Sequence, residues 1–157
     1  MVKIQLSNKR IIKDVTTVWY EHGPEVDIVM DLKKLTFAPG SLEEIYTFHV
    51  LDHIFPNEVK DIIANWKSCL KKGGRLIVVA DDFDFLSRAY IGGDFSIDFY
   101  NENFTHPMYF NRESLCQVLA DAGFPEKEIV IWFQDVVKDG VTIIPKAQHE
   151  IIFQAQL

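Results

Sequence analysis

The sequence predicts a single α/β domain whose sheet is mostly parallel and ends in an antiparallel hairpin. Short apolar segments alternate with segments of helical periodicity, which is typical of α/β domains. The turn dipeptide Asp139 and Gly140 separates the last two apolar segments, which favours antiparallel pairing there. The chain has 157 residues, of which 48% are hydrophobic and 25% charged. That length and composition suit one globular domain over residues 1–157.

The first half of the chain is predicted to form four strands joined by short connections. The strands are expected at Val2–Leu6, Val15–Tyr20, Val26–Met30 and Glu44–Phe48. About eight residues separate the first two strands, and about five separate the next two. A parallel crossover normally needs a dozen or more residues, usually a helix. We therefore expect reduced helices on this half and exposed apolar sheet surface. We also expect a homodimer or a tight hetero-partner that uses this face or the aromatic segment 83–110.

The second half is predicted to alternate helices and strands in the usual way. One helix is expected to begin at the cap Asn57, to bury Val59 through Leu70, and to end before Gly73. A second helix is expected from the cap Asn111 to Gly123. The remaining strands are expected at Arg75–Ala80, Glu128–Val137 and Glu150–Ala155.

Residues 83–110 show no clear periodicity, yet they hold nine of the twenty aromatic residues of the chain. A long irregular loop is uncommon inside a compact domain and often serves as a lid or a binding loop. Three interpretations stay open: a packed insertion or dimer contact, a substrate lid or pocket wall, and a disordered segment.

Composition excludes several classes of function. The chain carries 16 basic and 23 acidic side chains, a net charge of −7, which disfavours nucleic acid as a partner. The longest apolar runs have five residues, and residues 1–10 lack the apolar region of a signal peptide, so no membrane association is expected. Only two cysteines occur, Cys69 and Cys116, both within helical patterns. A reducing, cytoplasmic compartment is therefore expected.

Candidate functional residues follow the predicted strands, because open α/β sheets bind ligands beyond the carboxyl ends of their strands. Acidic residues follow most of these strands and suit hydroxyl, amine or sulfonium groups better than phosphate. The positions in question hold Ser7, Asn8, Glu21, Asp31, Leu32, His49, Asp52, His53, Asp81 and Asp82.

The spacing of His49, Asp52 and His53 (i, i+3, i+4) would place their side chains on one face of a helical turn. A histidine there can accept a proton from an acceptor oxygen or nitrogen. Two other interpretations stay open: a polar turn that caps the following helix, and a zinc or iron site built from the three side chains. We expect no metal.

Three blocks carry a family resemblance. The first block has two segments. Val26–Leu32 ends in Asp31 and Leu32, and Phe37–His53 ends in a pattern of His49, Asp52 and His53. The second is Trp66–Val78 with Gly73 and Gly74, and the third is Phe110–Leu115 followed by Leu119–Phe124. Together these blocks resemble compact class I S-adenosylmethionine (SAM)-dependent methyltransferases of the methyltransferase type 11-like group.

The resemblance implies a Rossmann-like sheet of seven strands, with SAM as the cofactor across the ends of strands one to four. Leu6, Ser7 and Asn8 stand where the family has a glycine-rich loop, and the glycines are absent. Glycines there let the backbone approach the cofactor closely. Glu21 would bind the ribose hydroxyls. Asp31 and Leu32 would bind the adenine, and His49 would lie beside the cofactor.

The resemblance also implies transfer of a methyl group to a small-molecule or sugar-type acceptor. Asp52 and His53 would face the acceptor, and His106, which precedes the third block, is a further candidate base. Catalysis would come mainly from holding the acceptor in line with the methyl group. The alternative is a non-catalytic methyltransferase-fold binding module or partner subunit that has lost the glycine-rich loop.

Overall fold

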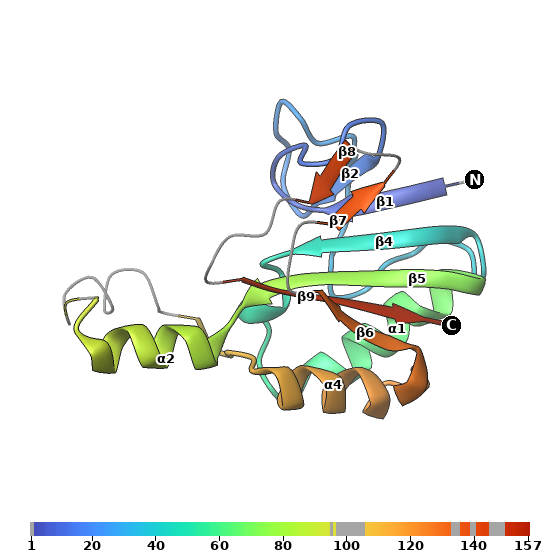
Figure 1. The fold of residues 1–157 in the computed structure, drawn as a ribbon. Coiled ribbons are helices and arrows are strands. Elements are labelled where there is room, and N and C mark those ends of the chain that lie inside the picture. Colours follow the sequence, from blue (N-terminus) through green and yellow to red (C-terminus); the bar gives the residue numbers. More distant parts are fainter. Residues whose placement is uncertain (1, 95, 97–105, 133–135, 139–140, 145–149) are drawn as a thin grey trace.

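A computed structural model describes residues 2–94, 96, 106–132, 136–138, 141–144 and 150–157. Its main sheet has seven strands in the order β3-β2-β1-β4-β5-β9-β6 (Figure 1). The strands of this sheet are β1 (Val2–Leu6), β2 (Thr16–Trp19), β3 (Ile28–Val29), β4 (Leu42–Phe48), β5 (Leu70–Asp81), β6 (Ile129–Trp132) and β9 (Glu150–Gln156). All pairs from β3 to β5 are parallel, and β9 runs antiparallel to both β5 and β6. The predicted fold class is confirmed.

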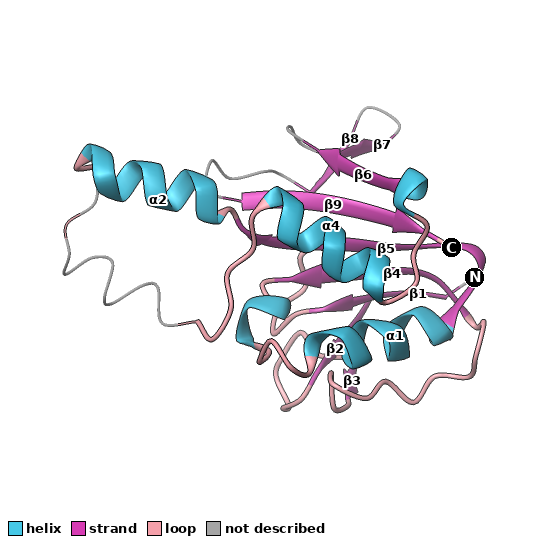
Figure 2. Cartoon of the chain, turned by 90° about the horizontal axis from the view of Figure 1, so that it is seen from below, coloured by secondary structure: helices cyan, strands magenta, loops and turns pink. Residues whose placement is uncertain are grey.

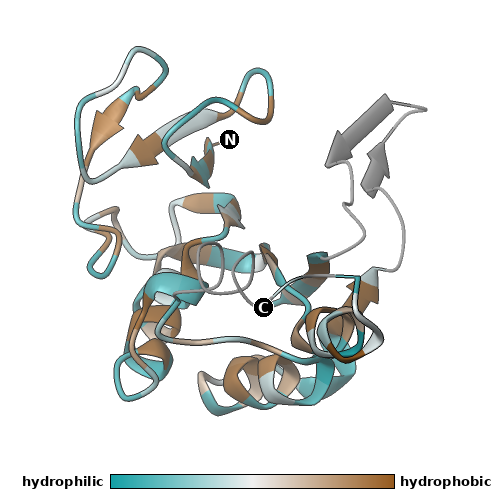
Figure 3. Cartoon of the chain, turned by 90° about the vertical axis from the view of Figure 1, so that its left-hand side faces the viewer, coloured by the Kyte–Doolittle hydropathy of each residue, from teal (hydrophilic) through white to brown (hydrophobic). Residues whose placement is uncertain are grey.

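Helices α1 (Val59–Cys69) and α4 (Arg112–Asp121) lie together on one face of this sheet (Figure 2). The residues that fill the space between them and the strands form the larger core. Trp66, Phe110 and Phe153 are the largest of its fully buried side chains. Figure 3 shows the apolar residues concentrated in the strands and parts of the helices, with hydrophilic residues in most connecting loops.

The opposite face of the sheet is covered by the loop 7–15 between β1 and β2. This is the half of the chain for which reduced helices are expected. No helix occurs in residues 7–41, which the structure describes throughout, and this confirms the expectation. Ile12 and Val15 of that loop pack on Phe48 and Ile77 in a second, smaller core. Phe48 and Ile77 are 9% and 4% exposed. The expected exposure of apolar sheet surface is therefore wrong for this face, because the loop and neighbouring side chains bury it.

The two helix starts differ from each other. Asn111 caps α4, as predicted. The cap is a capping box, in which the side chains of Asn111 and Ser114 each accept a hydrogen bond from the other's backbone N–H. Gly123 follows α4 with φ +91°. Helix α1 begins after Glu58 without a side-chain cap, so the predicted cap at Asn57 is wrong.

Part of the aromatic segment 83–110 is helical, whereas its sequence shows no clear helical periodicity. Helix α2 (Phe83–Gly92) begins at Asp82, whose carboxylate accepts hydrogen bonds from two backbone N–H groups, and ends at Gly93 with φ +82°. It projects away from the body of the domain (Figures 1 and 2). Residues 95 and 97–105 lie outside the described part, so the interpretations proposed for the rest of this segment stay predictions.

The C-terminal region contains one more hairpin than predicted. Strands β7 (Val136–Lys138) and β8 (Val141–Ile144) pair antiparallel in a separate two-stranded sheet. The turn residues Asp139 and Gly140 lie outside the described residues. Among the described residues, no helix is both long enough and apolar enough to cross a membrane.

Candidate functional site

A cavity of about 330 Å³ lies beyond the carboxyl ends of β2, β3 and β4. Its wall is mostly apolar, with a carboxylate, an ammonium group and an imidazole at separate points. The lining residues are Trp19, Tyr20, Asp31, Leu32, Lys33, Val50, His53 and Ile54. An apolar cleft with a few polar groups is typical of small-molecule sites. Three residues predicted from the sequence line it, namely Asp31, Leu32 and His53.

The Asp31–Leu32 turn is held in place by helix α1. The indole N–H of Trp66 donates a 2.7 Å hydrogen bond to the carbonyl of Leu32. Asn65 bonds both backbone groups of Leu35, accepting from its N–H and donating to its carbonyl. Asp31 itself accepts a bond from the backbone N–H of Lys33 at 2.9 Å. These bonds fix the floor of the cavity against the larger core.

An aromatic residue occupies the wall where the resemblance implied an acid. Tyr20 follows β2, lines the cavity and packs against Trp19 with ring centroids 4.8 Å apart. Glu21 and Asn8 are exposed and are not among the described lining residues. The structure therefore brings Tyr20, and not Glu21, to the cavity.

The segment after β1 lacks the glycines of the family's loop and continues the pairing of the sheet. The side chain of Leu6 is fully buried in the larger core, and Ser7 is 4% exposed. The N–H of Ser7 donates to the carbonyl of Val18, which continues the parallel pairing with β2. This backbone N–H is consequently occupied within the sheet.

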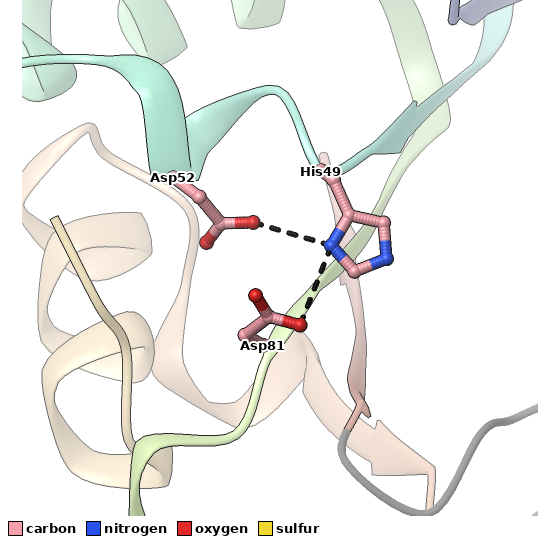
Figure 4. A group of neighbouring side chains, drawn as sticks. All are labelled: His49, Asp52 and Asp81. Carbon is pink, nitrogen blue, oxygen red and sulfur yellow. Dashed lines mark ion pairs between the residues drawn. The ribbon is translucent and has the colours of Figure 1, made fainter. Parts of the chain in front are cut away.

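A second group of polar side chains gathers around His49 (Figure 4). His49 follows β4 and has φ +51°, an uncommon value for a residue other than glycine. Its Nδ1 lies 3.4 Å from a carboxylate oxygen of Asp52 and 3.6 Å from one of Asp81. Its Nε2 lies 2.8 Å from an oxygen of Glu150. Both ring nitrogens of His49 are thus directed to carboxylates.

Electrostatics favour a charged His49 in this arrangement. Burial works against the charged ring, but the nearby carboxylates of Asp52, Glu150 and Asp81 outweigh it and raise the pKa of His49 to about 10. Asp52 is fully buried. It can therefore act only through its neighbours and not by touching an acceptor, contrary to the role expected from the sequence.

His53 and His106 form a separate pair. Their rings meet edge to face with centroids 4.4 Å apart, and Nε2 of His106 lies 3.7 Å from Asp81. Burial and the neighbouring His106 lower the pKa of His53. A neutral His53 at the cavity wall can accept a proton. The predicted shared face holds for His49 and Asp52, whereas His53 turns toward His106.

Two members of these groups were weakly indicated or missed by sequence reasoning. The sequence marks Asp81 only as an acid that follows a strand. Glu150 begins the last predicted strand, and no motif there indicates a functional role. The two residues are direct cross-strand partners in the antiparallel pair β5–β9. Only the register of that pair reveals the contact, and the sequence does not specify it.

Comparison with known proteins identifies the class of the fold. Over 99% of its length the chain superposes on a SAM-dependent methyltransferase from Thermotoga maritima, covering 81% of that chain, with a TM-score of 0.71 and 15% identity. A SAM-dependent methyltransferase from Archaeoglobus fulgidus gives a TM-score of 0.62 and 14% identity, over 91% of this chain and 76% of that one. The structure thus has the class I methyltransferase fold.

The sequence of the first half agrees with that class. Residues 7–78 match the family model described as a methyltransferase domain. By its fold and by this match, the chain is similar to the class I methyltransferases. No curated protein matches the sequence.

A third structure contains bound ligands. It is the 1,6-didemethyltoxoflavin N1-methyltransferase of Burkholderia thailandensis, with 1,6-didemethyltoxoflavin and S-adenosylhomocysteine. Its TM-score is 0.62 and its identity 14%, over 99% of this chain and 70% of that one.

Proposed function

We propose that the protein is a SAM-dependent methyltransferase that acts on a small-molecule or sugar-type acceptor. The observation that carries the proposal is the cavity between Tyr20, Asp31 and Val50 at the carboxyl ends of β2–β4, in a chain with the methyltransferase fold. The ligand-bound Burkholderia structure supports a small-molecule acceptor, since its own substrate is small.

The cavity fits the adenosine part of SAM. Leu32, Val50 and Ile54 offer an apolar slot for a purine, and Tyr20 adds an aromatic wall. The Asp31 carboxylate suits an amino or hydroxyl donor, as predicted. The fit is weaker toward Ser7, because that segment has no glycine and its N–H is already bonded to Val18. SAM supplies an electrophilic methyl group on its sulfonium sulfur.

The chain contributes binding, orientation and a base. The cavity walls would hold the two reactants in line, which is the main source of rate in such transfers. His53 lines the cavity and its pKa is lowered, so its neutral ring can accept the proton that the acceptor loses. His106, in edge contact with His53, would act as a positioning residue.

Calorimetric titration of the purified protein with SAM and with S-adenosylhomocysteine tests the proposal. Asp31→Ala should weaken binding about tenfold, the equivalent of one lost hydrogen bond to a charged group. The matched control is Asp121→Ala, because Asp121 is an exposed acid on α4 whose bond is to Gln117. Absence of binding by the wild-type chain to either compound at millimolar concentration would refute the enzyme assignment.

One observation favours the non-catalytic alternative. The loop 7–15 has neither glycines nor a helix beside the expected methionine end of the cofactor. Another neighbour with this fold is a putative methyltransferase from Haloferax volcanii in complex with a Trm112 activator, at 12% identity and a TM-score of 0.57. If SAM binds but no acceptor is methylated by the chain alone, a partner-subunit role is supported.

A homodimer stays part of the proposal, through the aromatic segment 83–110, which is one of the two surfaces expected for it from the sequence. Helix α2 projects from the domain, and its Phe83, Tyr90 and Ile91 are 42%, 40% and 83% exposed. Apolar side chains on a projecting helix favour association with another surface. Light scattering of the wild type and of Ile91→Lys tests this, with loss of the dimer expected in the variant.

The cytoplasmic location stays a prediction, consistent with two free cysteines.

A further inference from the structure

We propose that His49, Asp52 and Asp81 form a binding site for one divalent transition-metal cation. The three residues come from the carboxyl ends of the neighbouring strands β4 and β5 and from the turn η1 (Leu51–His53). One ligand atom from each lies within 4.8 Å of the other two (Figure 4). None of the three is among the described residues that line the cavity, so the candidate metal site adjoins the proposed SAM site without sharing a lining residue with it.

The separations between the ligand atoms match those around a metal better than those of hydrogen bonds. Nδ1 of His49 lies 3.4 Å from Asp52 and 3.6 Å from Asp81. Both distances exceed the 2.7–3.2 Å usual for N–H···O bonds. Two ligands held at about 2.1 Å from a tetrahedral ion lie about 3.4 Å apart. A small inward movement of the side chains would complete the coordination.

Asp52 supplies the second, independent reason. It is 0% exposed, and neither of its carboxylate oxygens has a hydrogen-bond partner among the described residues. A buried carboxylate is costly unless it is paired and hydrogen-bonded. Among the residues that the structure describes, its ion-pair contact is with His49, toward which it points. A metal cation that displaces the proton on Nδ1 of His49 would give the Asp52 carboxylate a direct partner.

The surroundings of His49 are those of a metal ligand. Its Nε2 lies 2.8 Å from Glu150, so the N–H on that side can donate to a carboxylate while Nδ1 faces the other two acids. Metal-binding histidines usually donate their second N–H in this way, which fixes the tautomer and the ring orientation. Asp81 and Glu150 are directly opposed across β5 and β9, where like charges destabilise the pair. A cation would relieve that repulsion.

The ligand set indicates the class of metal. One imidazole with two carboxylates suits Mn²⁺, Fe²⁺, Co²⁺ or Zn²⁺ better than the all-oxygen preference of Mg²⁺ and Ca²⁺. His49 is 34% exposed at its side chain, so solvent reaches the site. Three protein ligands leave at least one position for water or another ligand, as in catalytic metal sites.

The test is a titration of the full chain, freed of metal with EDTA and dialysed, with MnCl₂ followed by electron paramagnetic resonance. We expect one Mn²⁺ per chain with a dissociation constant below about 100 µM. Asp81→Asn and His49→Asn should each weaken binding at least about 100-fold, and Glu150→Gln about 10-fold. Asparagine tolerates the left-handed backbone at position 49. Zn²⁺ and Co²⁺ should displace Mn²⁺ from the same site.

The matched controls are Asp121→Asn and His22→Asn, an exposed acid and an exposed histidine outside the cluster, which should leave binding unchanged. Circular dichroism of each variant without metal establishes that it is folded. No saturable binding by the folded wild type up to about 1 mM Mn²⁺ would overturn the proposal. So would equal binding by the wild type and by folded Asp81→Asn and His49→Asn. Because no SAM is present, failure here is distinguishable from failure of the methyltransferase proposal.

Discussion

The two faces of the sheet are covered by different means. On one face, α1 and α4 bury a large apolar core around Trp66. On the other, the loop 7–15 lies over a smaller core, and the strands there bury polar side chains such as Gln5 and Glu44. A helix satisfies its own backbone hydrogen bonds, whereas an irregular loop does not. A sheet face covered by a loop therefore needs buried polar side chains to bond that loop.

Gln5 performs this task on the loop-covered face. Its side-chain oxygen accepts from the backbone N–H groups of Ile11 and Ile12, and its amide nitrogen donates to the carbonyl of Ile12 and the hydroxyl of Thr17. Four bonds satisfy a fully buried amide. The difference between the faces predicts that one is sensitive to lost volume and the other to lost hydrogen bonds.

Removing the centre of the helix-covered core should have the largest effect. Trp66→Ala deletes a fully buried ring and the bond to the Leu32 carbonyl, and we expect a loss of about 4 kcal/mol in the free energy of unfolding. Urea denaturation measures it. Trp66→Phe keeps most of the ring and should cost about 1–2 kcal/mol. Equal losses in the two variants would contradict the dominance of packing on this face.

Replacing Gln5 with leucine should remove the hydrogen bonds to the loop 7–15 while the buried side-chain volume stays nearly unchanged. Gln5→Leu leaves the N–H groups of Ile11 and Ile12 without their acceptor, and we expect a loss of about 3 kcal/mol. Thr17→Val removes only one of the four bonds and should cost about 1 kcal/mol. Denaturation midpoints of the two variants test the order. A Gln5→Leu protein as stable as the wild type would refute the role assigned to the amide.

The free energy of unfolding should depend on pH through Glu44, a buried acid on the loop-covered face. Burial alone would raise the pKa of Glu44, but hydrogen bonds from Lys3 and Tyr46 and the charge of Arg75 lower it from 4.5 to about 2. The unfolded chain therefore takes up this proton first as the pH falls. The stabilisation is present above pH 4.5 and is lost between 4.5 and about 2, amounting to about 2–3 kcal/mol.

Unfolding free energies of the wild type and Glu44→Gln between pH 2 and pH 6 test this prediction. The variant should be less stable near pH 6 and should show a flatter acid limb. Parallel profiles for the two proteins would show that Glu44 does not titrate in this range.

The sequence predicts the architecture of the sheet better than it predicts the site. Alternating apolar and helical segments, short early connections and the family resemblance lead to the sheet of class I methyltransferases, including the missing early helices. These features depend on local patterns and on chain length. Asp81 and Glu150 are 69 residues apart in the sequence, and they meet only because of the register in which β5 and β9 pair. No local sequence pattern reveals that register.

Local signals also mislead where tertiary contacts compete with them. The periodicity of α2 was obscured by the many aromatic residues near it, although Asp82 and Gly93 mark both ends of the helix. Spacing placed His53 with His49 and Asp52, but the turn η1 is a 3-10 helix of three residues. The tighter turn buries Asp52 and leaves His53 at the surface beside His106.

The smallest predicted effect concerns the helix starts on the helix-covered face. Asn111→Ala removes the side-chain bond to the Ser114 N–H at the start of α4, and we expect a loss of about 1 kcal/mol. Asn57→Ala is the matched control, since Asn57 shows the same sequence signal but α1 begins after Glu58 without a side-chain cap. Thermal unfolding of both variants should lower Tm only for Asn111→Ala. An equal shift for Asn57→Ala would mean that α1 begins at Asn57 after all, and that both helices of this face depend on their caps.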